Sequence, residues 1–256
     1  MTCYEIFIRC FPEMGLSEDL FRELSGIDSG TLIESDGGFA LISGSDIRLL
    51  CVAPERQENG TGSRLLARAE EHIRRSGGKH AVLGGSGSQL LIGAPERSAG
   101  FFTKRGYDLT ERCAEMYGEP GSLDLDCPEC PGAEFDFYGG DVSGAVAAVD
   151  PDWVQYFGES EVYCGIVGGE IASFCLLDED VKCIFPGRKV GSIGCVGTVP
   201  EFRRRGIGLR MVAEASKELI RRGCDRIFIH YTGVYDWYAR LGFRTGLMLR
   251  MGGKKL

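Results

Sequence analysis

Residues 198–208 read Thr-Val-Pro-Glu-Phe-Arg-Arg-Arg-Gly-Ile-Gly, and residues 52–62 read Val-Ala-Pro-Glu-Arg-Gln-Glu-Asn-Gly-Thr-Gly. In both stretches a Pro-Glu pair and a Gly-x-Gly step stand in the same register. Self-similarity at a fixed offset is typical of duplicated structural units. The chain is therefore expected to contain the same fold twice.

The sequence downstream of each Gly-x-Gly repeats as well. A stretch of helical periodicity follows each one and ends at arginines and a glycine, which is a common helix exit. Short apolar runs come next, at residues 81–83 and 227–229, and each predicts a strand. An aromatic pair followed by a glycine closes both series, at residues 101–107 and 237–243. Shared landmarks in one order support a tandem repeat.

Strand-like runs precede each Gly-x-Gly, separated by glycine or aspartate turns. They lie at residues 31–34, 39–43 and 47–52, and again at residues 162–167, 171–177 and 190–198. Each half then reads as three strands, a helix, a strand, a helix and a closing strand. This order predicts a mixed α/β fold whose sheets are mostly antiparallel. We place the domains at residues 1–118 and 133–256, joined by a linker over residues 119–132.

The composition limits the class of protein. The 256 residues are 43% hydrophobic and 26% charged, as in an ordinary globular protein, and the net charge is −8. That charge argues against a nucleic-acid partner, since such binding depends on phosphate neutralisation. No apolar run reaches 18 residues, so no membrane span is expected. Residues 1–11 lack the layout of a signal peptide, so we expect a cytoplasmic protein.

Eleven cysteines are scattered along the chain, mostly in apolar runs, and are expected to be reduced. Cys127 and Cys130 have ligand-like spacing. A structural zinc site needs four ligands, and neither a second cysteine pair nor a His-x₃-His follows. The sequence favours a plain loop here and no metal.

A strand that runs into Gly-x-Gly at the start of a helix can bind an anion. The first amide groups of a helix have no partner within it, the helix dipole adds positive charge, and glycine lets a ligand approach the backbone. The Gly-x₄-Gly-Lys-Ser/Thr and Gly-x-Gly-x-x-Gly motifs are both absent, which disfavours a nucleotide-binding module.

These residues resemble the GCN5-related N-acetyltransferase (GNAT) superfamily, in particular a bacterial group with two such domains in tandem. Its Gln/Arg-x-x-Gly-x-Gly/Ala signature is matched at residues 203–208 and 57–62, and its later aromatic run at residues 237–243. The resemblance implies two acyl-CoA N-acyltransferase folds, a pseudo-dimer within one chain, and acetyl-CoA as co-substrate. The loop amides would hold the coenzyme A pyrophosphate, and the preceding strand edge would pair with the pantetheine arm.

Coenzyme-binding positions follow from the resemblance in both halves. In the second half they are Val196, Gly197, Thr198, Arg203, Arg204, Arg205, Gly206, Ile207 and Gly208. In the first half they are Leu50, Cys51, Val52, Gln57, Gly60, Thr61 and Gly62. The loop at 203–205 is basic whereas residues 57–59 are Gln-Glu-Asn, so the second half is expected to bind the phosphates better.

The resemblance makes Tyr238 the general acid that protonates the coenzyme A thiolate, since a phenol is well matched to a thiol leaving group. Phe102 stands at the equivalent position of the first half and cannot donate a proton. For the general base His230 is the first candidate. Asp236 and the run Asp178-Glu179-Asp180 are the others, although the run also fits a solvated turn.

The main hypothesis is acetyl transfer from acetyl-CoA to a primary amine by direct attack, in the second half of the chain. The first half would be a degenerate partner. The alternative is a non-catalytic acyl-CoA sensor or scaffold. The acceptor is expected to be a small-molecule or peptide amine that the sequence does not specify further, and the acidic net charge favours a cationic one.

Overall fold

The fold is given by a computed structural model that describes residues 1–85, 90–158, 162–179, 181 and 187–256. Contacts divide the chain into two units. Unit 1 contains Met1–Cys113 and Leu247–Leu256, and unit 2 contains the described residues from 114 to 181 together with Gly187–Gly246. Each unit is a mixed α/β structure, which confirms the predicted fold class.

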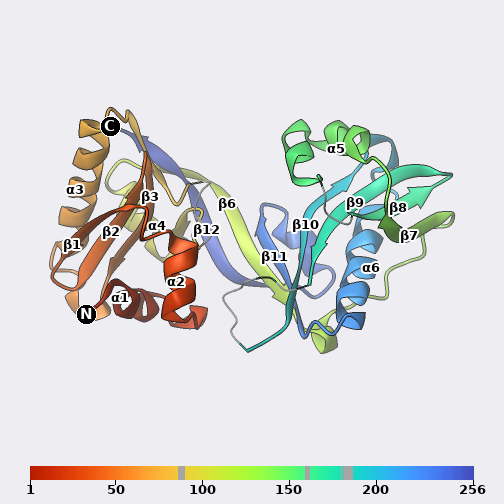
Figure 1. The fold of residues 1–256 in the computed structure, drawn as a ribbon, viewed down its shortest axis with the longest axis horizontal. Helices are drawn as coiled ribbons and strands as arrows, with labels where there is room; N and C mark the ends of the chain where they lie inside the picture. Colours follow the sequence, from red (N-terminus) through yellow and green to blue (C-terminus); the bar gives the residue numbers. More distant parts are fainter. Residues whose placement is uncertain (86–89, 159–161, 180, 182–186) are drawn as a thin grey trace. The chain divides into compact units, whose positions relative to one another are not determined.

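Unit 1 has a sheet in the order β1-β2-β3-β4-β12, with β3 and β4 parallel and the other pairs antiparallel. Figure 1 labels its strands and helices apart from β4 and β5. They are α1 (Cys3–Cys10), α2 (Glu18–Ser25), β1 (Thr31–Ser35), β2 (Gly38–Ser43), β3 (Asp46–Val52), α3 (Thr61–Arg75), β4 (His80–Leu83), β5 (Ala94–Pro95), α4 (Glu96–Thr103), the start of β6 (Asp108–Gly118) and the end of β12 (Arg244–Lys255).

Helices cover both faces of this sheet, because strands β2 and β3 are apolar on both sides. Ala40 and Ile42 join the cluster that contains Leu66 and Ile73 of α3. Their neighbours in the sequence point to the opposite face, where α1 packs and where Phe39 of β2 stands opposite Cys51 of β3. Strand β2 is consequently buried along five of its six residues.

Unit 2 has a sheet in the order β7-β8-β9-β10-β11, continued by the end of β6, with β10 and β11 parallel and the other pairs antiparallel. Figure 1 also labels its elements apart from α7. They are β7 (Ala133–Tyr138), α5 (Ser143–Val149), β8 (Val162–Val167), β9 (Glu170–Asp178), β10 (Val190–Thr198), α6 (Ile207–Arg221), β11 (Arg226–Thr232), α7 (Tyr235–Ala239) and the start of β12 (Arg244–Lys255).

Two helices lie on opposite faces of the unit 2 sheet. Phe174 of β9 packs with Val146 of α5 in one apolar cluster. On the other face Leu219 of α6 approaches so closely that a Cβ on Gly191 would lie 2.9 Å from it. Since Gly191 pairs with Ile227, the side chain of Ile227 also faces α6, and Phe228 faces the opposite way.

The two loops that the repeat predicts have the same backbone. Helices α3 and α6 both contain 15 residues, and each starts after a left-handed glycine, Gly60 (φ 75°) or Gly206 (φ 82°). Two residues earlier, Glu58 and Arg204 are also left-handed, with φ of 63° and 64°. Short 3₁₀ helices precede both loops, at Pro54–Arg56 and Pro200–Phe202. The sequence repeat therefore reflects a structural one.

The closing strands differ from the simple repeat. Each half was expected to close its own sheet, but residues 114–118 of β6 pair with β11 in unit 2, and Gly253–Lys255 of β12 pair with β4 in unit 1. The end of the closing strand of each half therefore pairs with the sheet of the other half. The domain limits at residues 118 and 133 stay predictions.

Helices α1, α2 and α5 were not identified from the sequence. The N-terminal residues looked like a short alternating pattern, but α1 forms from Cys3 because Thr2 and Glu5 make a capping box. None of the described helices is long and apolar enough to cross a membrane.

Candidate active site

In unit 2, strands β10 and β11 pair over three positions, from Val190–Arg226 to Ser192–Phe228. Beyond that point β10 contains a bulge between Gly194 and Gly197, and Cys195 has a left-handed φ of 47°. The last residues of β10 consequently border a cleft of about 730 Å³ rather than a neighbouring strand. A backbone edge next to such a cleft can hydrogen-bond an extended ligand.

The loop that follows β10 forms the floor of this cleft. Arg203 donates from Nε to the carbonyl of Thr198 at 2.9 Å, which folds the turn back onto the strand. Helix α6 then begins at Gly206 with no side chain capping its N-terminus. A Cβ on Gly208 would stand 2.7 Å from Thr198 Oγ1. Glycine here and the uncapped helix start leave room for an anion on the amides.

Every residue that the sequence assigned to coenzyme binding in this half lines the cleft. Those residues are Val196, Gly197, Thr198, Arg203, Arg204, Arg205, Gly206, Ile207 and Gly208.

The Cys-Pro-Glu-Cys segment also lines this cleft, which the sequence did not indicate. Cys130 Sγ lies 3.8 Å from the carbonyl of Arg205, and Arg210 donates to the carbonyl of Cys127 at 2.8 Å. Within the described part of the chain, no group of three or more His, Cys, Asp or Glu residues could hold a metal ion. The segment therefore acts here as a wall of the cleft, held to α6 and its loop.

Tyr238 lies on α7 and lines the same cleft, with 5% of its surface exposed. Its ring meets those of Trp237 and Phe243 edge-on, with centroids 4.8 and 6.1 Å apart. Burial raises the pKa of its phenol above the ordinary value. Tyr238 therefore stays protonated at neutral pH, as a proton donor must.

His230 lies on β11 but is not among the residues that line the cleft. Its side chain is 41% exposed, yet the surrounding protein lowers its pKa to about 4. Its Nδ1 stands 3.6 Å from Oε1 of Glu115.

Glu115 is a functional candidate that the sequence analysis missed. It comes from the end of β6, is 3% exposed, and burial raises its pKa to about 8. An acidic residue inside the apolar run Cys-Ala-Glu-Met at residues 113–116 was the available signal. It was not used because residues 1–118 were placed in the first domain, whereas His230 was placed in the second.

The other candidate bases lie in different surroundings. Asp236 is exposed on α7 and does not line the cleft. Asp178 is exposed at the end of β9, and Glu179 pairs with Lys189 at 3.1 Å, as expected of a solvated turn. Asp180 lies outside the described residues.

Unit 1 carries an equivalent loop. Gln57 donates from Nε2 to the carbonyl of Val52 at 2.9 Å, which is the contact that Arg203 makes with Thr198 in unit 2. The sequence contrasted this loop with the basic one, but Arg105 at the end of α4 supplies a cation beside it. Its guanidinium donates to Ser63 Oγ at 2.6 Å and lies 3.8 Å from the centre of the Phe101 ring.

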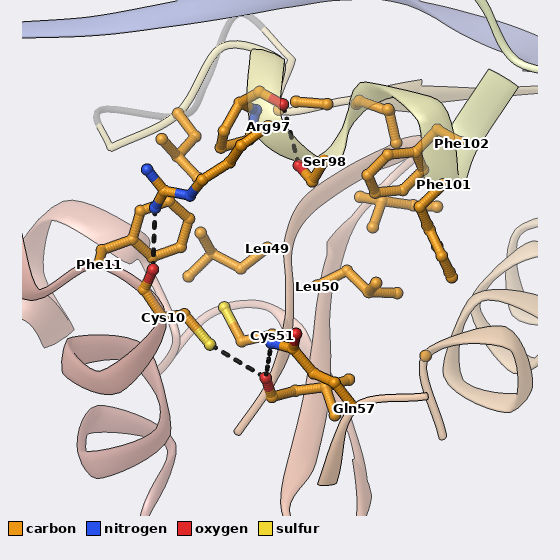
Figure 2. A pocket seen from close by; sticks show the side chains of 18 of the residues that line it. Cys10, Phe11, Leu49, Leu50, Cys51, Gln57, Arg97, Ser98, Phe101 and Phe102 are labelled. Carbon is orange, nitrogen blue, oxygen red and sulfur yellow. Dashed lines mark hydrogen bonds between the residues drawn. The ribbon is translucent and has the colours of Figure 1, made fainter. Parts of the chain in front are cut away.

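A second cleft of about 660 Å³ lies in unit 1, and Figure 2 shows its lining. The predicted residues Leu50, Cys51, Val52, Gln57, Gly60 and Gly62 line it, together with Phe102. Thr61 is buried in the first turn of α3 and is not part of the lining.

Two thiols meet at the edge of this cleft. Cys10 of α1 points toward Cys51 of β3 in Figure 2 and donates to the carbonyl of Val52 at 3.3 Å. A hydrogen bond between the two thiols lowers the pKa of Cys10 and raises that of the fully buried Cys51. Cys10 is therefore the more reactive of the two.

Comparison with known proteins agrees with this geometry. Residues 126–243 match the model of the Acetyltransferase (GNAT) family. The match covers the described loop at 203–208 and ends at the aromatic run. The first half of the chain lies outside the matched residues.

Solved structures show the same fold. A GCN5-related N-acetyltransferase from Sphaerobacter thermophilus is 19% identical over 98% of this chain and 90% of its own, with a TM-score of 0.68. A tandem GNAT protein from the clavulanic acid biosynthesis pathway is 12% identical over 88% and 81%, with a TM-score of 0.58.

A glucosamine N-acetyltransferase region of a fungal multi-domain β-N-acetylglucosaminidase is 20% identical over 97% of this chain, with a TM-score of 0.73. This chain spans 36% of that protein. At these identities the likeness establishes a GNAT-like fold.

Proposed function

From a chain with the fold of the GNAT acetyltransferases, we propose an N-acyltransferase that moves an acetyl group from acetyl-CoA to a primary amine in unit 2. One observation carries the proposal. The edge of β10, the uncapped start of α6 and the phenol of Tyr238 all line a single cleft of about 730 Å³. A strand edge, an anion site and a proton donor are what this transfer needs.

The residues present fit coenzyme A. The amides at the start of α6 suit a pyrophosphate, and the space above Gly208 would be filled by any larger residue. Arg203, Arg204 and Arg205 line the same part of the cleft and supply positive charge. The edge at Val196 to Thr198 would hold the pantetheine arm, as the sequence resemblance implies.

Acetyl-CoA, when bound, supplies the acetyl group. Tyr238 would protonate the departing thiolate, and its burial keeps the phenol in the protonated form at neutral pH. The acceptor must lose a proton before it attacks, and His230 is the first candidate for this step. The amine itself is expected to be cationic, in keeping with the net charge of −8.

The two domains would lie at residues 1–118 and 133–256, with a linker between them. The first domain would be a degenerate partner of the second. Phe102 lies at the position of Tyr238 and cannot protonate a thiolate. The unit 1 cleft still has the loop geometry and Arg105. An acyl-CoA sensor is therefore the second candidate function, for unit 1 in particular.

The test separates these functions. Coenzyme A binding is measured by calorimetry for the wild type, for Gly208→Ala and for Gly62→Ala, whose added Cβ would lie 3.3 Å from the Phe101 ring. Gly144→Ala in α5 is the control, because nothing lies within 4 Å of its Cβ position. We expect Gly208→Ala to remove binding at unit 2, and Gly62→Ala to show whether unit 1 holds a second molecule.

Turnover is then measured as coenzyme A released from acetyl-CoA in the presence of spermidine, glucosamine or lysine. Release that depends on the amine supports the enzyme. Binding without release supports the sensor, and no binding to the wild type contradicts both.

A further inference from the structure

The last residues of β6 enter the sheet of unit 2 next to β11. Gly118 pairs with Ile227, Tyr117 with Phe228 and Met116 with Ile229. These residues follow directly from the first half of the chain. The second half therefore completes its sheet with a strand that the first half provides.

The register places Glu115 and His230 on one face of this sheet. Tyr117 faces the same way as its partner Phe228, and alternation puts Glu115 and His230 on that face too. Helix α6 covers the opposite face, against Gly191 and Ile227. The observed separation of 3.6 Å between Nδ1 and Oε1 agrees with this placement.

The burial of the Glu115 carboxyl group is unfavourable in free energy. Its side chain is 4% exposed, and Oε2 is buried with no hydrogen-bond partner among the described residues. Buried carboxyl oxygens nearly always have partners, because an unpartnered one loses its hydrogen bonds to water and gains none in the protein. A group kept at such a cost is a functional candidate.

His230 has the complementary property. Its side chain is 41% exposed, so it can reach an acceptor. With Nδ1 turned to Glu115, Nε2 is the nitrogen that can face the substrate. An imidazole whose pKa is lowered to about 4 is a weak base by itself. A carboxylate beside it stabilises the imidazolium and makes it a stronger one.

We propose that Glu115 and His230 act as one proton-accepting pair for the amine, with His230 as the base and Glu115 as its positioning residue. This inference rests on the proposed function. The ammonium of the acceptor gives its proton to His230 Nε2, and the nitrogen keeps the electron pair with which it attacks the acetyl carbon. The Glu115 carboxylate balances the charge of the imidazolium.

The apparent pKa of such a pair belongs to both groups. Burial raises the pKa of Glu115 to about 8, so the pair is without its proton above that pH. A proton acceptor near pH 8 is well matched to work at physiological pH.

Other ionisable side chains lie on this face and need to be considered. Arg226 of β11 is paired with Glu119 at 2.6 Å and lies 4.8 Å from the centre of the Tyr117 ring. On β12, Gly246 packs against Tyr117 and carries no side chain, and Arg244 is exposed. Helix α5 has no ionisable residue, and Asp178 lies at the exposed end of β9.

The test compares wild type with Glu115→Gln, Glu115→Asp and His230→Gln. The pH profile of kcat/KM is measured with the best amine of the panel. At each pH the kcat/KM of the variant is divided by that of the wild type, so that the effect of amine ionisation cancels. We expect the wild type to gain activity through a limb near pH 8. Glu115→Gln should lose that limb and about 10²-fold in kcat/KM at pH 8.5, and Glu115→Asp should recover part of it.

Coenzyme A affinity should stay unchanged in all three variants. The double variant Glu115→Gln with His230→Gln should lose no more than either single one, because residues that act as a unit are not additive. The side chain of His230 is 41% exposed, so His230→Gln remains informative should Glu115→Gln not fold.

If Glu115→Gln and His230→Gln both keep the wild-type pH profile and the wild-type kcat/KM, the proposed pair is wrong, whereas the proposed acyltransferase function is unaffected. A wild type that binds coenzyme A and acetylates no amine would overturn the proposed function, and the pair with it.

Discussion

Glu58 and Arg204 occupy the same turn position in the two units, with left-handed φ of 63° and 64°. A left-handed conformation is uncommon for residues other than glycine, so both loops are held by their surroundings. Gln57 and Arg203, one residue earlier, each return a hydrogen bond of 2.9 Å to the preceding strand. The two units share the backbone conformation of an anion site, whereas the side chains on the two loops differ in charge.

That divergence predicts unequal binding. Changing both Arg203 and Arg205 to Ala should weaken coenzyme A binding by about tenfold or more, since each charge-assisted contact to a phosphate contributes about 1.5–3 kcal/mol. Calorimetry at two salt concentrations measures the effect, and the salt dependence should also decrease. Arg221→Ala is the control, because Arg221 is 73% exposed at the far end of α6. Equal losses in the two variants would contradict a phosphate site at the loop.

Tyr238→Phe should lower kcat by about 10²- to 10⁴-fold and leave coenzyme affinity nearly unchanged. The ring keeps its packing against Trp237 and Phe243, and only the proton donor is lost. Steady-state kinetics and calorimetry on the same preparation give both values. The reciprocal Phe102→Tyr should restore little. A Tyr238→Phe enzyme with wild-type kcat, in a reaction not limited by product release, would remove the acid role.

Glu115 should make stability depend on pH. Its pKa is raised from 4.5 to about 8 in the folded protein, so between these values the native state binds more protons than the unfolded chain. Stability contributed by this group is therefore lost as the pH rises from about 5 to 8. Glu115→Gln should gain at least about 1 kcal/mol on wild type over that range, or about 2–4 °C in Tm. Thermal unfolding at pH 5 and 8.5 measures it, and a pH-independent difference would contradict the raised pKa.

The unit 1 cleft can be probed through Cys10. Its thiol lines the cleft and has a lowered pKa, whereas Cys51 is 2% exposed. Iodoacetamide should therefore modify Cys10 well before Cys51, as read by peptide mass spectrometry. If unit 1 holds coenzyme A, the ligand should slow modification of Cys10. Cys3, which is partly exposed on the same helix and has a raised pKa, serves as the slow reference. Faster reaction at Cys51 would contradict the arrangement of the pair.

The sequence alone determined the repeat, the mixed α/β class and the two loops. A Gly-x-Gly sequence after a strand can adopt few backbone conformations. The periodicity that predicts the following helix depends only on residues close together in the sequence. The strands predicted at 162–167 and 190–198 have the bounds that the structure gives them. The residues of the second loop fall on one cleft because they are neighbours in the chain, so that spacing in the sequence already fixes their proximity.

Only the tertiary structure decided which strand completes which sheet. Pairing of β6 with β11 and of β12 with β4 joins residues far apart in sequence, and no local pattern states the partner of a closing strand. The sequence therefore did not show that Glu115 is a neighbour of His230. It also did not show that Arg105 supplies a cation at the start of α3, because these residues too are distant in the sequence. A charge in an apolar strand and an arginine after a helix are ordinary in a sequence. They acquire a chemical meaning only from the side chains that folding brings within a few ångströms of them.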